Sequence, residues 1–147
     1  MQELNKYLDT FNIIIKDLSD YQPNVRLGGT LVLKLLGLNF SRPVGDLDII
    51  IINPTTEQKI YLKALNFFNI NSGSPGEHNF KFQKSGLYLN ILCVDNSIAN
   101  IGSLYYHHNN NKYHLVSIDE IIEAKKKYSR KKDMQDFLIL KNENFNL

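Results

Sequence analysis

A strand opened by two acidic residues constrains the fold of this chain more than any other feature. It begins with Asp46-Leu47-Asp48 and continues with four consecutive isoleucines, Ile49 to Ile52. β-Branched residues favour extended backbone, and an apolar run of this length is typical of a strand covered on both faces. Side chains two residues apart leave the same face of a strand, about 6.5–7 Å from each other. The sequence therefore predicts a strand over residues 46–52 that presents two carboxylates to one place.

Two neighbouring carboxylates have two interpretations. They repel each other unless a cation lies between them, and Mg²⁺ is commonly bound by one or two carboxylates together with phosphate oxygens of a substrate. The alternative is a pair of solvent-exposed acids at the start of a strand. The Asp46-x-Asp48 pattern leaves both open, because such tripeptides are common.

The rest of the chain alternates between helical and extended patterns. The spacing of apolar residues predicts helices over residues 2–21, 30–38, 57–68, 117–128 and 130–141. Strands are expected over residues 25–27, 46–52, 80–82, 87–94 and 113–116, with loops at 71–79 and 95–111. The prediction is one domain spanning residues 1–147, of class α+β (α/β), in which a small mixed β-sheet is flanked by helices. Helix 2–21 lies at the N-terminus and the helix pair 117–141 at the C-terminus.

Composition excludes several classes of protein. The single cysteine, Cys93, excludes an internal disulfide framework and a zinc site built on Cys-x-x-Cys, and its apolar neighbours predict a buried thiol. The N-terminal residues lack the pattern of a secretory signal, and no stretch has the ~18 apolar residues of a membrane span. We therefore expect a cytoplasmic protein that has no contact with a membrane.

Positive charge is concentrated near the C-terminus. Residues 123–133 contain six of the 17 basic residues and two of the 15 acidic ones, although the net charge of the chain is only +2. A solvated helix face and an anion-binding surface both explain this pattern. Composition does not distinguish between them.

Gly28-Gly29-Thr30 follows a predicted strand and opens a predicted helix. Paired glycines allow the backbone to approach a ligand, with amide N–H groups available to an anion. A tight strand-to-helix turn explains the glycines equally well. Together with Asp46 and Asp48, however, they combine a phosphate-binding turn with a metal-binding strand, which is what nucleotide chemistry requires.

These motifs resemble the nucleotidyltransferase superfamily with the polymerase-β-like fold. The resemblance rests on Leu27-Gly28-Gly29-Thr30 and on Arg42-Pro43-Val44-Gly45-Asp46-Leu47-Asp48-Ile49, and Arg42 is similar to an arginine of small prokaryotic members of abortive-infection and toxin–antitoxin types. The resemblance implies a nucleoside triphosphate as substrate and Mg²⁺ as cofactor. It also implies that Asp46 and Asp48 hold the metal, and that the phosphates contact Gly28, Gly29, Thr30 and Arg42.

A second match lies near the C-terminus. Ala124-Lys125 and Arg130-Lys131-Lys132-Asp133-Met134-Gln135-Asp136 resemble a Lys…Arg-x-Lys-Asp-x-x-Asp signature of such minimal domains. Asp133 and Asp136 share a helix face and are expected to form ion pairs with the basic residues. Lys125 is the candidate phosphate contact, and a solvated lysine is the alternative.

Asn90 departs from the family pattern, which has a third carboxylate on a later strand. An amide oxygen ligates a metal weakly and cannot act as a general base, a role worth about 10²- to 10⁴-fold in rate. The prediction is therefore a magnesium-dependent nucleotidyltransferase of weak or lost activity, whose acceptor is a hydroxyl of RNA, protein or a small molecule. The alternative is an inactive nucleotide- or partner-binding module of a toxin–antitoxin or phage-defence system. Glycosyltransferases and aspartate phosphatases also use Asp-x-Asp, but neither explains Gly28-Gly29. The oligomeric state is left open.

Overall fold

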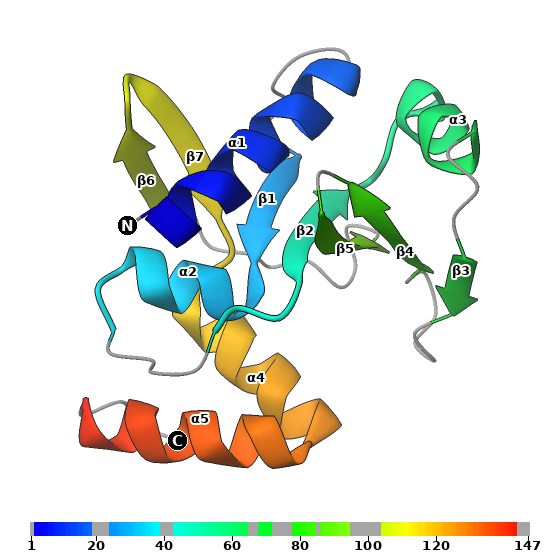
Figure 1. Cartoon of the computed structure of the whole chain (residues 1–147). Coiled ribbons are helices and arrows are strands. Elements are labelled where there is room, and N and C mark those ends of the chain that lie inside the picture. The colour runs from blue at the N-terminus through cyan, green and yellow to red at the C-terminus, as the bar shows by residue number, and fades with distance from the viewer. Residues whose placement is uncertain are drawn as a thin grey trace.

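A single mixed β-sheet lies at the centre of this computed structural model (Figure 1). The structure describes residues 2–18, 24–38, 43–64, 68–71, 78–84, 86–94 and 104–143. Its helices are α1 (Gln2–Asp17), α2 (Gly29–Leu35), α3 (Thr56–Ala64), α4 (Ile118–Tyr128) and α5 (Lys131–Asn142). Its strands are β1 (Val25–Gly28), β2 (Leu47–Ile52), β3 (Phe68–Asn71), β4 (His78–Lys84), β5 (Leu87–Val94), β6 (Leu104–His108) and β7 (Asn111–Leu115). The fold class is α+β, as predicted.

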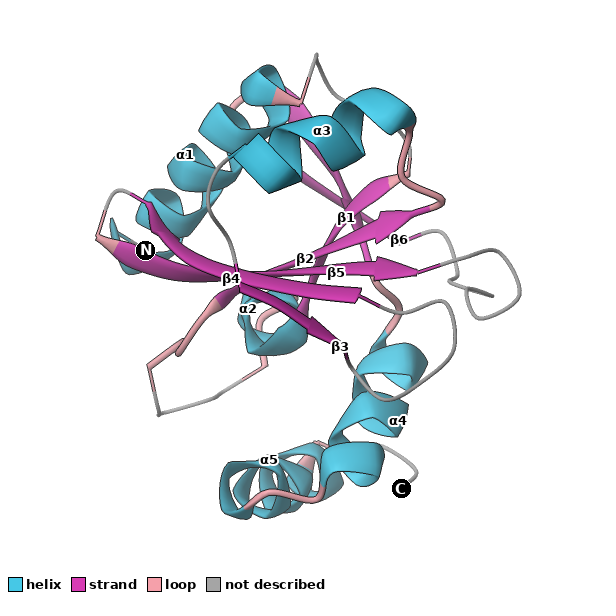
Figure 2. Cartoon of the chain, turned by 90° about the vertical axis from the view of Figure 1, so that its right-hand side faces the viewer, coloured by secondary structure: helices cyan, strands magenta, loops and turns pink. Residues whose placement is uncertain are grey.

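The strands are ordered β3-β4-β5-β2-β1-β7-β6 across the sheet. β2 runs parallel to β5 and antiparallel to β1, and β1 runs parallel to β7, so the sheet is mixed. Helices α1 and α3 cover one face, whereas α4 and α5 lie on the other side (Figure 2). Helix α2 follows β1 directly and packs against α4. This arrangement brings β1, β2, α2 and α4 together at one end of the sheet.

Burial alternates along β2. Leu47, Ile49 and Ile51 are fully buried, where they pack in the core under the helices, and each contributes roughly 1.5–3 kcal/mol of hydrophobic stabilisation. The residues between them are only half-buried, including Ile50. The expectation that this strand is covered on both faces was therefore wrong, because its second face lines a pocket. The strand also begins at Leu47, one residue later than predicted.

Two strands lie where a helix or a loop was expected. Phe68 belongs to β3, which pairs with β4, and α3 already ends at Ala64. The segment Tyr105-Tyr106-His107-His108 was expected in a loop, but it belongs to β6 and forms a hairpin with β7. In both cases the pairing partner supplies hydrogen bonds that a short segment cannot make alone.

The remaining elements agree closely with the sequence predictions. The helix expected over residues 2–21 is α1, and residues 19–21 lie outside the described part of the chain. Ser117 caps α4 by accepting a hydrogen bond from the Glu120 backbone N–H, and Ser129 ends that helix in the left-handed conformation at φ 47°. Cys93 is buried, and burial raises the pKa of its thiol to about 12. Among the described helices, none is both long and apolar enough to cross a membrane.

Candidate functional site

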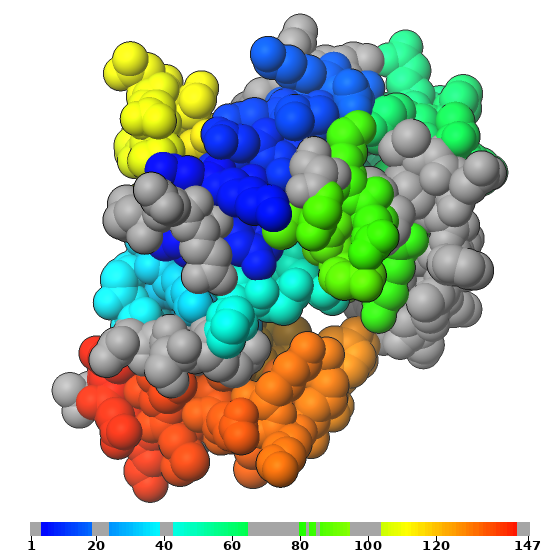
Figure 3. Space-filling model, in the orientation of Figure 1, coloured from blue at the N-terminus to red at the C-terminus, as the bar shows by residue number. Residues whose placement is uncertain are grey.

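A pocket of about 540 Å³ separates the second face of the sheet from α4 and the start of α5. In the space-filling view, the surface is hollowed between α4 and the strands above it (Figure 3). The residues that line the pocket are Gly28, Gly29, Thr30, Gly45, Asp46, Asp48, Ile50, Lys81, Asn90, Leu92, Val94, Val116, Glu120, Ile121, Glu123, Ala124, Lys125, Lys127, Tyr128, Arg130 and Lys132. The glycine turn and both acids of the predicted site therefore face one cavity.

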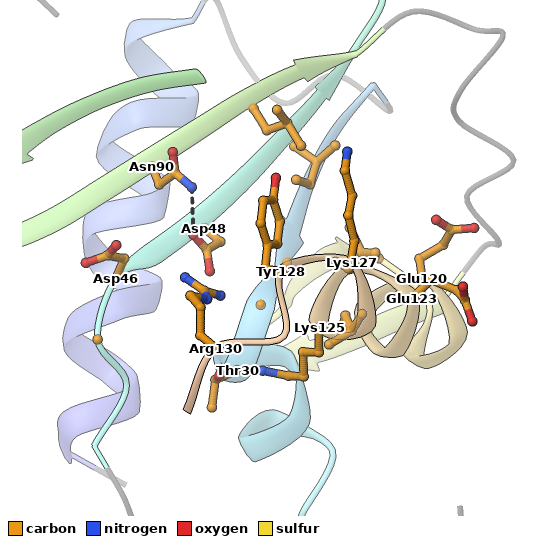
Figure 4. A pocket seen from close by; sticks show the side chains of 18 of the residues that line it. Thr30, Asp46, Asp48, Asn90, Glu120, Glu123, Lys125, Lys127, Tyr128 and Arg130 are labelled. Atoms are coloured by element: carbon orange, nitrogen blue, oxygen red, sulfur yellow. Dashed lines mark hydrogen bonds between the residues drawn. The ribbon is translucent and has the colours of Figure 1, made fainter. Parts of the chain in front are cut away.

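Strand pairing explains why these distant segments meet. Asp48 lies at the centre of the sheet, opposite Gly28 on β1 and opposite Asn90 on β5. Asp46 lies in the bend just before β2 and lines the same pocket. The spacing of the acids, together with the antiparallel and parallel pairing of β2, thus places three polar side chains beside the turn that ends β1 (Figure 4).

Gly29 is required by a close approach of Asp48. Its backbone has φ +69°, a conformation that residues with a side chain rarely adopt, and a Cβ atom at this position would overlap the Asp48 carboxylate. The second glycine of the turn therefore leaves room for the carboxylate, in addition to any contact with a ligand. This contact joins the two sequence motifs directly.

Asn90 lies beside Asp48. Its Nδ2 donates a hydrogen bond of 3.3 Å to Asp48 Oδ1, while its own Oδ1 is buried and has no hydrogen-bond partner among the described residues. An unpaired buried oxygen costs about 1–3 kcal/mol. The amide therefore turns its N–H side to Asp48, while its unpaired oxygen points away from that carboxylate (Figure 4).

The pKa of Asp48 is raised to about 6. Burial is the main cause, because it disfavours the charged carboxylate, and the negative charge of Asp46 acts in the same direction. The hydrogen bond from Asn90 and the positive charges of Lys132 and Lys125 oppose this effect only in part. A cation bound beside Asp48 would favour the charged carboxylate and lower its pKa.

Lys125 is buried between three elements. Its Nζ lies 2.6 Å from Asp136 Oδ2 and 3.7 Å from Asp133 Oδ1 on α5, and it donates a 3.4 Å hydrogen bond to Thr30 Oγ1 on α2. The solvated-lysine alternative was therefore wrong, since only 5% of the residue is exposed. Lys125 lines the pocket, and its contact with a phosphate stays a prediction.

The expected pairing of Asp133 and Asp136 with the basic cluster is present. Asp133 accepts hydrogen bonds from Arg130, at 3.0 Å from the backbone N–H and 2.9 Å from Nε, and so caps α5. Burial by itself raises the pKa of Asp133, but the bonds and charge of Arg130 outweigh it and hold the pKa below its ordinary value. The side chains of both aspartates are fully buried, so this cluster fixes how α4 and α5 meet beside the pocket.

The donor atoms fit a hard divalent cation that shares its coordination with a substrate. The carboxylates of Asp46 and Asp48 and the unpaired oxygen of Asn90 are oxygen donors of the kind that Mg²⁺ binds. In the described part of the chain, no group of three or more His, Cys, Asp or Glu residues is placed to hold a metal. Two carboxylates fit a hard divalent cation and would leave coordination positions for other oxygen ligands.

One predicted residue is not among those that the structure describes, and some pocket residues were not predicted. Arg42 lies outside the described residues. Lys81, Tyr128, Arg130 and Lys132 line the pocket without having been proposed as site residues. The basic cluster was visible in the sequence. The direction of Tyr128 was not, because it depends on where α4 ends.

Comparisons with known proteins support the fold. No family model and no curated protein matches this sequence. Among solved structures, the chain is similar to the crystal structure of a protein from Thermotoga maritima that is provisionally named a nucleotidyltransferase, with a TM-score of 0.62 and 17% sequence identity. The similarity covers 95% of this chain and 94% of that chain. The fold is therefore nucleotidyltransferase-like.

Proposed function

We propose that this chain binds a nucleoside triphosphate together with Mg²⁺ and transfers the nucleotidyl group to a hydroxyl. The observation that carries the proposal is that Asp46, Asp48 and Asn90 line one pocket together with the Gly28-Gly29 turn, with the Asp48 carboxylate against Gly29. The nucleotidyltransferase-like fold of the Thermotoga maritima protein supports the same class of activity.

Each residue has a specific role in this proposal. Asp46 and Asp48 would hold the metal, with Asn90 as a weaker neutral ligand. When bound, Mg²⁺ would supply positive charge that neutralises the triphosphate and helps to orient the α-phosphate for in-line attack. Gly28, Gly29 and Thr30 approach the phosphates, and Arg42 and Lys125 add positive charge. We propose RNA, a protein or a small molecule as the acceptor and the cytoplasm as the place of the activity.

Titration calorimetry tests nucleotide binding. ATP, CTP, GTP and UTP are titrated with and without Mg²⁺ into the wild-type chain and into the Asp48→Asn variant. We expect binding that requires Mg²⁺ and is lost in the variant. Magnesium-dependent binding that survives Asp48→Asn would mean that the nucleotide site lies elsewhere.

Asn90 favours a second candidate, a module that binds nucleotide or a partner without catalysis. The position that carries the third carboxylate in the family holds an amide, which cannot take a proton from the acceptor hydroxyl. Transfer of a labelled nucleotide separates the candidates, since binding without transfer favours the module. Because the motif that contains Arg42 resembles small prokaryotic members of such types, we propose a toxin–antitoxin or phage-defence system as the context of the second candidate.

A further inference from the structure

Tyr128 is an exposed aromatic residue inside the pocket. It is the last residue of α4, 45% of it is exposed, and its ring extends from the helix end toward the sheet, between Asp48 and Lys127 (Figure 4). The structure gives this ring no apolar packing role that would explain its place, because it is not part of the core. A large exposed ring in a pocket is suited to contact a ligand.

The pocket wall that faces this helix changes from polar to apolar along the strands. Asp48 and Asn90 are paired across β2 and β5, and the next residues on the same face are Ile50 and Leu92, also paired. They lie about 6.5–7 Å further along the strands. Val94 continues the apolar wall. The pocket therefore suits a ligand with a charged group at one end and a flat apolar group at the other.

Two cations flank the tyrosine. The Arg130 guanidinium carbon lies 5.3 Å from the centre of the ring, and Lys127 Nζ lies 5.7 Å from it. Arg130 is held in place by its hydrogen bonds to Asp133. Both cations lie over the ring, so a group that stacks on Tyr128 shares the ring surface with a positive charge.

We propose that the nucleobase stacks on Tyr128, with the apolar strand residues Ile50 and Leu92 forming the opposite wall. This inference rests on the proposed function, and it assigns the two ends of the pocket to the two ends of the nucleotide. Stacking needs only the π-face that every base has, so Tyr128 contributes to affinity for all four nucleotides.

The test compares ATP with inorganic triphosphate, which has no base, both titrated in the presence of Mg²⁺. Tyr128→Ala is expected to weaken ATP binding about 5- to 150-fold, the range seen when a stacking aromatic is removed, and to leave triphosphate binding unchanged. Tyr128→Phe keeps the ring and is expected to bind ATP like the wild type. Tyr105→Ala is the matched control, because Tyr105 is also exposed and has Lys112 Nζ 4.0 Å from its ring centre, but it lies on β6 and does not line the pocket.

Each outcome decides one question. Unchanged ATP binding by Tyr128→Ala would overturn the inference while leaving the proposed function intact. An equal loss of ATP and triphosphate binding would also overturn it, because Tyr128 would then act through the phosphate end of the pocket. If the wild-type chain binds neither ligand, the proposed function itself fails, and the inference fails with it. Thermal unfolding of both alanine variants verifies that they are folded.

Discussion

Replacement of Asp48 by asparagine should stabilise the protein while removing its proposed function. The difference between a pKa of about 6 and the ordinary value of 3.8 corresponds to about 3 kcal/mol, at about 1.4 kcal/mol per pKa unit. Asp48 is only half-buried, so the water of the pocket screens part of this cost, and we expect a gain of about 1–3 kcal/mol above pH 7. Asparagine is close in shape to aspartate and retains an oxygen that accepts the hydrogen bond from Asn90.

The raised pKa of Asp48 determines how the stability gain of Asp48→Asn varies with pH. Because the pKa of Asp48 is higher in the folded chain than in the unfolded one, the folded chain holds more protons between about pH 4 and pH 6. The contribution of Asp48 to stability is therefore lost as the pH rises through that window. The advantage of Asp48→Asn over the wild type should be near zero at pH 4 and should reach its full value above pH 6.

Thermal unfolding from pH 4 to pH 8 measures this difference. For a chain of this size, a gain of 1–3 kcal/mol raises the midpoint by about 3–10 °C. Asp9→Asn changes an exposed acid on α1 and is expected to alter stability by less than about 0.5 kcal/mol. An Asp48→Asn midpoint at or below that of the wild type at pH 8, or a difference that does not vary with pH, would refute the reasoning. Added Mg²⁺ should raise the midpoint of the wild type alone.

Three further predictions concern the surroundings of Asp48. Gly29→Ala should destabilise the chain by more than Gly37→Ala. Both glycines have positive φ, so a side chain costs roughly 1–2 kcal/mol at either position, but only at Gly29 does the new Cβ overlap the Asp48 carboxylate. Equal unfolding free energies of the two variants would refute the contact. Asn90→Asp should lower stability in EDTA and tighten Mg²⁺ binding, and it should accelerate nucleotidyl transfer by about 10²- to 10⁴-fold if the missing general base limits the reaction. Thermal unfolding measures the stability, calorimetry the Mg²⁺ affinity and labelled-nucleotide assays the transfer rate. Unchanged Mg²⁺ affinity would contradict the proposed metal site. Lys125→Met should cost about 3–5 kcal/mol in urea unfolding, because it removes the cation that the buried Asp136 contacts at 2.6 Å, whereas Asp133 keeps Arg130. A loss below about 1 kcal/mol would contradict the assigned ion pair.

The parts of the fold that were predicted from sequence are those in which local pattern and tertiary environment agree. Helix α1 buries residues at helical spacing, including Phe11 and Ile14, and β2 follows from its consecutive β-branched residues. The missed strands depend on pairing between segments. Phe68 continues the helical spacing of the preceding apolar residues, yet it pairs with Lys81 on β4. The β-propensity of a four-residue strand is too weak for the strand to be predicted against that helical pattern.

The hairpin of β6 and β7 did carry a local signal. Its two turn residues, Asn109 and Asn110, have φ of 49° and 64°, and asparagine is among the few residues that adopt such values readily. Three consecutive asparagines were interpreted as a polar loop. They also fit a hairpin whose two-residue turn is Asn109-Asn110. Further along that hairpin, Tyr106 and Tyr113 pair with each other and pack toward the core.

The site was predictable in its components but not in how they are joined. Asp48 and Gly29 stood out as separate motifs, and their spacing gave no indication that the glycine is needed because the carboxylate lies against its backbone. Lys125 likewise stood out as a basic residue in a helix, but its burial follows from Asp136 and Thr30, which lie 11 and 95 residues away along the chain. Each junction places a charge where it is wholly or partly removed from water, and such a charge is retained only where something compensates for the lost hydration. For Lys125 the compensation is visible in two aspartates. For Asp48 the structure provides one amide hydrogen bond, which leaves its pKa raised, and the missing compensation is what a bound cation would supply.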